Sequence, residues 1–260
     1  MIYLGGLYLR HISSIIASIK SYTYTNKVCS TSNIGKILSK VDEDDMAILY
    51  DSRYRKLSIK ISEICKTYPN KKALSFCSDR IEQLRYLDDK NFYTLNRSYH
   101  KPGRIYTKEG YAYKIGNYHQ GTNKVLGNNK VIYSRKDNVI EEEFIKGRSI
   151  RILWIYPGLM FIIEHINSKN WIMNIDPEEE IVTTPLQNNS KVILKIVDDV
   201  KEFIESNLEC KGIRSLTWGF DFIVGNKIGL LEINDMCGMP DNKDINIAFV
   251  DAILKIGNLK

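Results

Sequence analysis

The sequence predicts a small α/β lobe that is followed by a strand-rich α+β region. Strand and helix patterns alternate over residues 1–70, and apolar runs of strand length then follow one another over 110–166. Two amphipathic helical segments lie further on, at 189–209 and 244–256. This order is typical of helices that cover sheets. The chain has 260 residues, 43% of them hydrophobic, which is enough for one large domain or several small lobes.

The first lobe is predicted from four segments. Residues 1–6 form an apolar strand that ends in glycines, and 12–20 carry apolar residues at helical spacing. The compact apolar run within 44–52 is bounded by acids, which indicates a buried strand. Residues 57–68 have the pattern of an amphipathic helix that is stopped by Pro69. Two strand–helix pairs in succession predict the α/β lobe.

The strand-rich region begins after a helix predicted over 78–89, with Ser78 as its N-cap. The strands that follow are separated by loops and by one Pro-Gly turn. They are expected at 110–116, 130–134, 139–145 and 149–166. No internal repeat interrupts this order, so the two later helices are expected to cover the sheets.

Charge and cysteine content limit the classes of function. The net charge is +6 and the isoelectric point is about 8.9, which suits an anionic ligand such as a nucleotide. Without a dense Lys/Arg block, this charge does not favour nucleic acid. The five cysteines include no C-x-x-C pair, which favours a reducing compartment, and we expect a cytoplasmic location. The sequence has neither the pattern of a signal peptide nor an apolar run of membrane-spanning length, so no membrane partner is expected.

The most informative segment is an apolar hairpin predicted over 218–234, because three oxygen-bearing side chains interrupt it. If residues 226–227 form a two-residue turn, Asp221 pairs with Glu232 on one face of the hairpin. Asn234 falls on the same face two residues later. The opposite face is then plain core, and its members are Phe220, Phe222, Val224, Leu231 and Ile233.

Two carboxylates held side by side in this way require a compensating group. At about 4 Å their repulsion is roughly 4 kcal/mol at an effective dielectric constant of about 20. A shared proton, a basic neighbour or a cation can offset it, and a set of oxygen ligands suits Mg²⁺. The alternative is an edge hairpin whose polar face is simply hydrated. A change of one residue in the register would also scatter the three side chains.

A second informative segment is the glycine-containing loop that follows the strand at 110–116. Lys114 ends the strand and Lys124 follows the loop, and a lysine at a strand end can hold a phosphate as a point charge. Gly116 and Gly121 let the backbone approach phosphates and donate N–H groups. The loop is not a Walker A sequence, because G-K-[ST] is absent. A polar hairpin loop is the alternative interpretation.

The third segment runs from acids at a strand end into Phe144 and Ile145, and then into a strand that carries Arg151. Backbone groups beside Phe144 can form hydrogen bonds with the edge of an adenine ring, and one of the preceding acids can bind ribose hydroxyls. The alternative is a strand end with a hydrated acidic cluster.

In this order, the segments resemble the ATP-grasp superfamily over roughly residues 75–241. The lysine and glycine-containing loop come first, then E-E-F-I, an arginine at the start of a strand pair, W-I-M-N, and D…E-x-N. The loop is most similar to that of synapsins, whereas the later motifs are more similar to RimK-type and glutathione-synthetase-type ligases. The resemblance implies an ATP-grasp fold in three parts. These are a short N-terminal α/β lobe at 1–75, and two α+β subdomains clasping ATP, at 76–141 and, with the metal site, at 142–260.

The resemblance also implies roles for single positions. Those that match contacts to ATP are Lys114, Gly121 and Lys124 on the phosphate side and Glu142, Glu143, Phe144 and Ile145 in the hinge that holds adenine and ribose. Arg80 stands where the family usually has an early lysine that contacts the nucleotide. Asp221, Glu232 and Asn234 match the ligands of Mg²⁺, for which Mn²⁺ can substitute. Arg151 matches the arginine near the transferred phosphate. Asn174 matches an asparagine beside the reaction centre.

The activity implied by the resemblance is that of an ATP- and Mg²⁺-dependent carboxylate–amine ligase. ATP phosphorylates a carboxylate to an acyl phosphate, an amine then attacks the acyl carbon, and ADP and phosphate are released. The partners would be ATP, a carboxylate and an amine, supplied by an amino acid, a peptide or a protein terminus. Whether the chain forms a homo-oligomer stays open.

Two departures from the family pattern bear on the chemistry. These families usually carry an arginine where this chain has Glu164, and Pro-Gly in the loop where it has Cys237-Gly238. The first departure favours either a different acceptor or an alternative function, a synapsin-like ATP-binding protein with little ligase activity. A nucleic-acid-binding α/β protein is a further alternative, which only the charge favours.

Overall fold

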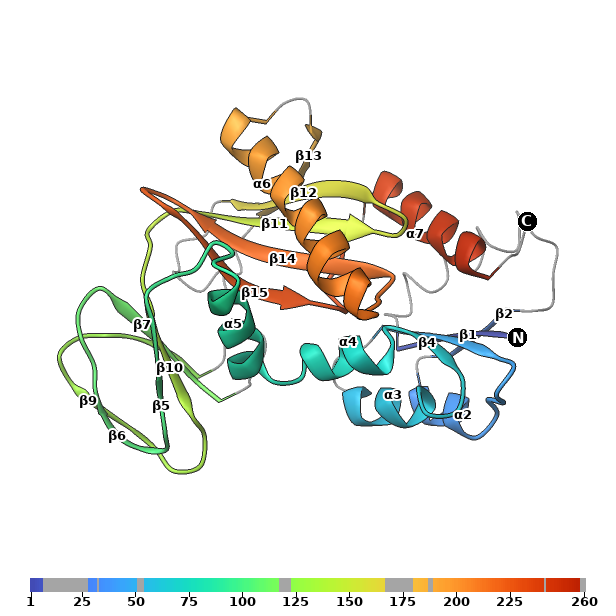
Figure 1. Ribbon diagram of the computed structural model, residues 1–260, viewed down its shortest axis with the longest axis horizontal. Helices are drawn as coiled ribbons and strands as arrows, with labels where there is room; N and C mark the ends of the chain where they lie inside the picture. Colours follow the sequence, from blue (N-terminus) through green and yellow to red (C-terminus); the bar gives the residue numbers. More distant parts are fainter. Residues whose placement is uncertain are drawn as a thin grey trace.

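The computed structural model describes residues 1–6, 28–31, 33–50, 54–116, 123–166, 180–186, 189–240 and 242–257. Within these ranges the strands form two sheets of four strands, one of five and one of two. Figure 1 shows the N-terminal sheet at one end of the molecule, the β5–β10–β7 strands at the other, and the five-stranded sheet between them. The described residues contain no helix that combines the length and the apolar character needed to cross a membrane.

The N-terminal sheet is parallel, with the strand order β2-β1-β3-β4. Its strands are β1 (Ile2–Gly5), β2 (Val28–Thr31), β3 (Met46–Leu49) and β4 (Lys66–Tyr68). Helices α2 (Ile34–Leu38) and α3 (Arg55–Ile61) share one core with this sheet, in which Ile37 and Ile61 are buried with Ala47. Parallel strands buried on both faces are the arrangement expected of an α/β lobe.

One helix prediction in this lobe is wrong. The helix expected over 57–68 ends at Ile61, and Lys66–Tyr68 form strand β4 beside β3. Pairing with a buried strand overrides helical spacing in so short a segment. The helix expected over 12–20 lies outside the described residues.

The second four-stranded sheet is antiparallel, with the order β5-β10-β7-β8. Its strands are β5 (Arg97–His100), β7 (Tyr111–Ile115), β8 (Lys124–Leu126) and β10 (Val139–Glu143). Strands β6 (Gly103–Tyr106) and β9 (Val131–Ser134) form the two-stranded sheet. Helices α4 (Lys71–Phe76) and α5 (Arg80–Asp89) precede these strands. The N-cap of α5 is Asp79 and not Ser78, because the Asp79 carboxylate accepts the N–H groups of the first turn.

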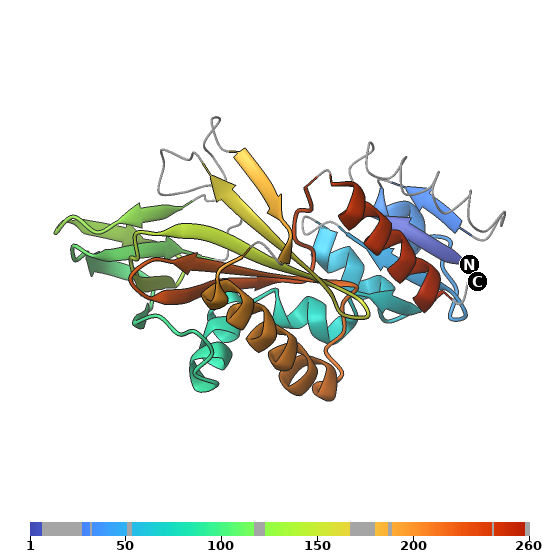
Figure 2. The same cartoon turned by 90° about the horizontal axis from the view of Figure 1, so that it is seen from above.

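The five-stranded sheet is antiparallel and carries the main core. Its order is β13 (Glu180–Thr184), β12 (Leu159–Ile166), β11 (Arg148–Ile155), β14 (Thr217–Val224) and β15 (Ile228–Asn234). One face buries Trp218, Phe220 and Phe222 under α5 and α6 (Lys191–Phe203), which lie on the same side of the sheet in Figure 2. Helix α6 continues as a π-turn (Ile204–Leu208) and a 3-10 turn (Glu209–Lys211).

The other face of this sheet is divided between a second core and open space. At one end, helix α7 (Lys243–Ile256) buries Ile245 and Phe249 together with Leu153 of β11 and Leu4 of β1. This shared core fixes the N-terminal lobe against the five-stranded sheet. At the other end the same face turns toward β7 and β10, and there the predicted polar side chains lie.

Candidate functional site

A pocket lies between the open face of the five-stranded sheet and the β5-β10-β7-β8 sheet, and most of the sequence-predicted site residues line it. Its lining residues are Ala112, Lys114, Lys124, Glu142, Glu143, Phe144, Ile145, Ser149, Arg151, His165, Asp221, Ile223, Leu231 and Glu232. Arg80 and Asn234 line an adjoining hollow that also contains Glu232. Residues far apart in the sequence therefore meet in one place.

Asp221, Glu232 and Asn234 lie together on the pocket face of the β14–β15 hairpin. Asp221 pairs directly with Glu232, as the sequence predicts. The Nδ2 group of Asn234 lies 3.2 Å from the Oδ2 atom of Asp221 and 3.3 Å from the Oε1 atom of Glu232, and donates to both. The three side chains thus converge on a single point, and we call them the acidic triad.

The rest of the predicted hairpin register is shifted by a bulge between Asp221 and Phe222. Phe222 pairs with Leu230, and the strands are joined by residues 225–227 in place of the two-residue turn. Leu231 is the additional residue of the bulge. It lines the pocket, whereas Leu230 is buried in the core and 1% exposed. The prediction that Leu231 faces the core is wrong.

Each carboxylate of the triad has an arginine partner. Arg151 forms two hydrogen bonds with Asp221, from Nε at 2.6 Å and from Nη2 at 2.8 Å. Burial lowers the pKa of Arg151, but the charge of Asp221 outweighs it and raises that pKa above its ordinary value. Arg80, at the start of α5, forms an ion pair with Glu232.

Glu232 is ionised because cations surround it. Burial raises the pKa of Glu232, but the charges of Arg80, Lys124 and Lys114 outweigh burial and hold this pKa well below its usual range. Lys114 and Lys124 are direct partners across β7 and β8, so their like charges are held side by side. Such a cluster has more positive than negative charge and favours a polyanionic ligand.

Glu142 positions Lys114. Its Oε1 atom accepts from Nζ of Lys114 at 2.5 Å, and its Oε2 atom accepts from Nε of Arg97 at 2.7 Å. Burial raises the pKa of Glu142, and these two cations reverse the shift so that the pKa is lowered. Burial is also the largest influence on Lys114, whose pKa is lowered. With both oxygens engaged, Glu142 holds a lysine in the pocket, and sequence reasoning missed Arg97.

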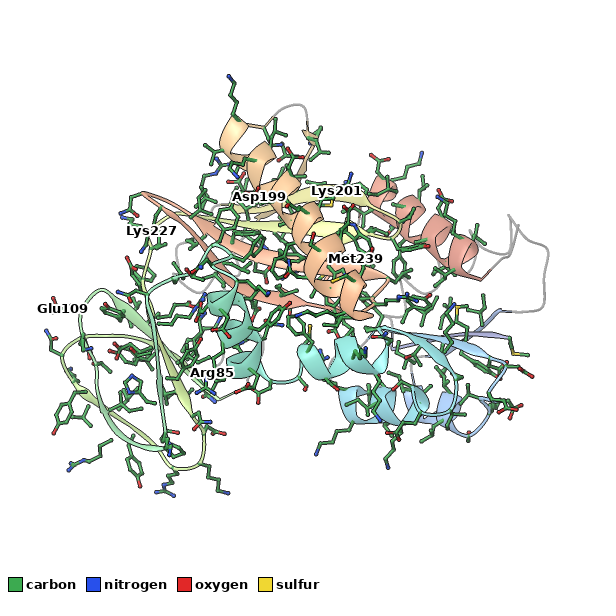
Figure 3. All side chains as sticks on the ribbon, in the orientation of Figure 1. Arg85, Glu109, Asp199, Lys201, Lys227 and Met239 are labelled. Carbon is green, nitrogen blue, oxygen red and sulfur yellow. The ribbon has the colours of Figure 1, made fainter. Side chains whose placement is uncertain are left out.

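The hinge is fixed against the tip of the β14–β15 hairpin. Glu143 forms an ion pair with Lys227, which Figure 3 labels at that tip. A side chain at Gly225 would collide with the carbonyl oxygen of Lys146, so the backbones of hinge and turn are in contact. The N–H of Phe144 donates to the carbonyl of Gly110 at 2.9 Å.

The backbone N–H of Ile145 in the hinge is a candidate donor to a ligand. Its N–H makes no hydrogen bond with any described residue, and its side chain is 5% exposed at the pocket wall. A buried donor without a protein partner is costly, so a ligand acceptor there would be favoured. An adenine ring edge supplies such an acceptor.

Glu164 lies on the sheet face opposite the pocket. It pairs with Ile150 across the sheet, and its carboxylate forms two hydrogen bonds with Arg148, at 2.5 and 2.6 Å. The next residue, His165, pairs with Ser149 and lines the pocket. Because side chains alternate along a strand, the histidine and not the glutamate reaches the site.

The loop after Asn234 is held by the N-terminal lobe. Arg55 forms two hydrogen bonds at 2.8 Å with Asp235, whose side chain is fully buried. The hydroxyl of Tyr50 donates to the carbonyl of Cys237. Nη1 of Arg151 donates to the carbonyl of Gly238 at 3.0 Å, which joins this loop to the acidic triad. Cys237-Gly238 therefore lies beside the site, although Pro-Gly is absent.

Two predicted positions, Gly121 and Asn174, lie outside the described residues. The same holds for residues 117–122 of the glycine-containing loop.

Magnesium fits the donor set of the acidic triad when other oxygen ligands complete its coordination. Among the described residues, no group of three or more His, Cys, Asp or Glu side chains could hold a metal. A cation at the triad would therefore rest on two carboxylates and, with the Asn234 amide turned so that its oxygen replaces Nδ2, on one amide oxygen. It would need further oxygen ligands from water or phosphate. The surrounding cations also disfavour a bare divalent ion, so a metal would bind together with a polyanion.

Comparisons with known proteins give structural matches alone. No protein-family model and no curated protein matches the sequence. The D-cycloserine synthetase DcsG is similar over 100% of this chain and 99% of its own, with a TM-score of 0.66 and 10% identity. The D-alanine–D-alanine ligase of Bacillus anthracis complexed with ATP is similar over 98% and 94%, with a TM-score of 0.63 and 13% identity. The ATP-grasp ligase PsnB complexed with a minimal precursor is similar over 98% of each chain, with a TM-score of 0.63 and 12% identity.

Proposed function

The chain has the ATP-grasp fold, and on that premise we propose that it is an ATP- and Mg²⁺-dependent carboxylate–amine ligase. The reaction would join a carboxylate to an amine through an acyl phosphate and release ADP and phosphate. The observation that carries this proposal is the acidic triad within a cluster of arginines and lysines, at the far end of the pocket from the hinge.

The arrangement suits Mg·ATP from one end of the pocket to the other. Adenine would lie at the hinge, with Ile145 as the backbone donor and Leu231 as an apolar wall. Lys114 and Lys124 would hold phosphate oxygens. Asp221, Glu232 and Asn234 would hold Mg²⁺, which would offset the negative charge of the phosphates.

The chemistry would proceed in two steps. A substrate carboxylate oxygen attacks the γ-phosphorus, the bond from the γ-phosphorus to the oxygen bridging it to the β-phosphate breaks, and ADP leaves with the bonding electrons. The amine nitrogen then attacks the acyl carbon, the carbon–oxygen bond to phosphate breaks, and the nitrogen loses a proton. Positioning and charge neutralisation by Arg151, Lys114 and Lys124 would supply most of the catalysis.

The rival proposal is an ATP-binding protein with little ligase activity. Two features of the sequence favour it, the glutamate at position 164 and the synapsin-like glycine-containing loop. Glu164 pairs with Arg148 on the far face of the sheet, so its charge does not enter the pocket. The rival therefore loses that argument, and a ligase accounts better for a site that also contains Arg151 and the neighbouring Gly238 carbonyl.

An ADP-release screen tests the proposal. The purified chain is incubated with Mg·ATP and pairs of amino acids, peptides and simple carboxylates, and ADP and phosphate are measured. A ligase releases ADP only when both a carboxylate and an amine are present, and Lys114→Met abolishes the release. ATP binding without ADP release from any pair would instead support the rival.

A further inference from the structure

The two-stranded sheet β6–β9 presents an open face that the proposed reaction does not use. Its inner face is packed, because Ile105 is buried with Tyr113 and Val139 of the neighbouring sheet. Its outer face consists of Arg104, Tyr106, Val131 and Tyr133, which the register places in two facing pairs. We call these four residues the ribbon face.

The ribbon face is unusually exposed for its composition. Tyr106 is 73% exposed and Tyr133 is 64% exposed, the highest values among the described large hydrophobic side chains. The side chains of Arg104, Tyr106 and Tyr133 make no hydrogen bond, ion pair or ring contact with any described residue. Tyrosine and arginine clustered on one face are typical of binding surfaces.

Positive charge is concentrated around this face. Residues 101–137 contain eight Lys or Arg and two Asp or Glu, so this segment alone carries a charge equal to the +6 of the whole chain. Lys114 and Lys124 line the pocket, and Lys108 pairs with Glu141. The others are Arg104 and its exposed neighbours Lys101, Lys130, Arg135 and Lys136, which form no ion pair with a described carboxylate.

The edges of the two-stranded sheet β6–β9 are also available for pairing with another strand. Strands β6 and β9 pair only with each other within the described part of the chain, so each has one edge without a strand partner. An extended peptide can add to such an edge through its main chain, while its side chains meet the flanking residues. Each strand has four residues, which gives a surface about 13 Å long, the length of a short extended segment.

We propose that the ribbon face docks an acidic, extended peptide segment. The segment would belong to a peptide substrate that is rich in carboxylates, and in this respect the proposal rests on the proposed function. The ribbon packs on the face of β7 that carries Tyr113, whereas the pocket is lined by Ala112 and Lys114 from the opposite face of the same strand. Docking would therefore hold a different part of the peptide from the part that bears the reacting carboxylate. It would raise the effective concentration of that carboxylate at the site.

Fluorescence anisotropy tests the docking without nucleotide. The probe is a fluorescein-labelled peptide in which glutamate alternates with valine, compared with the same peptide carrying glutamine and with a single-stranded DNA oligonucleotide. We expect the glutamate peptide to bind at least about tenfold more tightly than the glutamine peptide. The triple variant Arg104→Gln/Tyr106→Ser/Tyr133→Ser should lose about tenfold or more in affinity, because aromatic and arginine anchors dominate such surfaces.

A matched control is Lys191→Gln/Val192→Ser, which removes an exposed charge and an exposed apolar side chain from α6 and should leave peptide affinity unchanged. The thermal unfolding temperature should be the same in all variants, because the altered residues are exposed. The ATP affinity should also be the same, because none of them lines the pocket. Equal binding of the two peptides, an unaffected triple variant, or tighter binding of the DNA than of the peptide would overturn the docking proposal. Peptide docking at this face without ADP release from any substrate pair would refute the ligase and leave the docking in place.

Discussion

At the scale of single residues, the site is a set of buried charges that hold one another in place. Sequence patterns predict that Lys114 and Glu142 belong to the site, since both end strands next to distinctive motifs. They do not reveal that the two are partners, because that contact depends on how β7 pairs with β10. Arg97 carries no sequence signal at all, yet its side chain is 1% exposed and bonds to Glu142.

The Glu142 network gives a prediction for stability. Glu142→Gln leaves the buried Lys114 without its charged partner and leaves Arg97 with Asp88 alone, and should lower the free energy of unfolding by about 3 kcal/mol at neutral pH. The pKa of Glu142 is below its ordinary value of 4.5 in the folded chain, so its contribution is present above that pH and is lost as pH falls through the folded pKa.

The free energies of unfolding of wild type and Glu142→Gln should therefore converge as the pH is lowered below about 4.5. Urea denaturation at a series of pH values measures this. Glu63→Gln, which alters an exposed ion pair with Lys71, is the control and should have little effect. A difference that stays constant down to about pH 3 would show that ionisation of Glu142 is not its source.

At the scale of elements, the β14–β15 hairpin organises both the core and the site. A two-residue turn at 226–227 predicts the pairing of Asp221 with Glu232, and this pairing is confirmed although three residues form the turn, because the bulge offsets the change in register. The bulge could not be predicted, because Leu230 and Leu231 are the same residue type and a pattern of polarity cannot tell which one is additional. The same limit applied to β4, whose three residues are too few to define a period.

The two adjacent leucines provide a matched pair for testing the bulge. Leu230→Ala should lower the free energy of unfolding by about 3 kcal/mol, because Leu230 is buried in the main core. Leu231→Ala should have a much smaller effect on stability and should weaken ATP binding several-fold, because Leu231 lines the pocket. Chemical denaturation and calorimetric titration measure the two effects. The reverse outcome would place the additional residue at position 230.

At the scale of the whole molecule, the site depends on contacts between separate sheets. Alternating strands and helices predict the α/β lobe, and the order of motifs predicts an ATP-grasp fold, which is confirmed. The contact of the lobe with the loop after Asn234 could not be predicted. It joins Arg55 to Asp235 and Tyr50 to Cys237, and Arg55 and Tyr50 are remote in sequence from the loop and belong to no motif.

The Arg55–Asp235 pair predicts a long-range effect. Arg55→Met leaves the buried Asp235 carboxylate without its partner, and should lower the free energy of unfolding by about 3 kcal/mol. The double variant Arg55→Met/Asp235→Leu should recover part of this loss, because no unpaired charge remains. Chemical denaturation of Arg55→Met, of Asp235→Leu and of the double variant completes a double-mutant cycle. Additive losses in the double variant would mean that the two side chains do not interact.

The central claim is that the acidic triad holds Mg²⁺ together with the phosphates of ATP. It is tested most directly by calorimetric titration of ATP, with and without Mg²⁺, into the wild-type chain and into Asp221→Asn/Glu232→Gln. Asp199→Asn, which alters a carboxylate on α6, serves as the control. Wild type and control should bind ATP at least about tenfold more tightly with Mg²⁺, and the double variant should bind it equally in both conditions. An undiminished gain from Mg²⁺ in the double variant would contradict the claim.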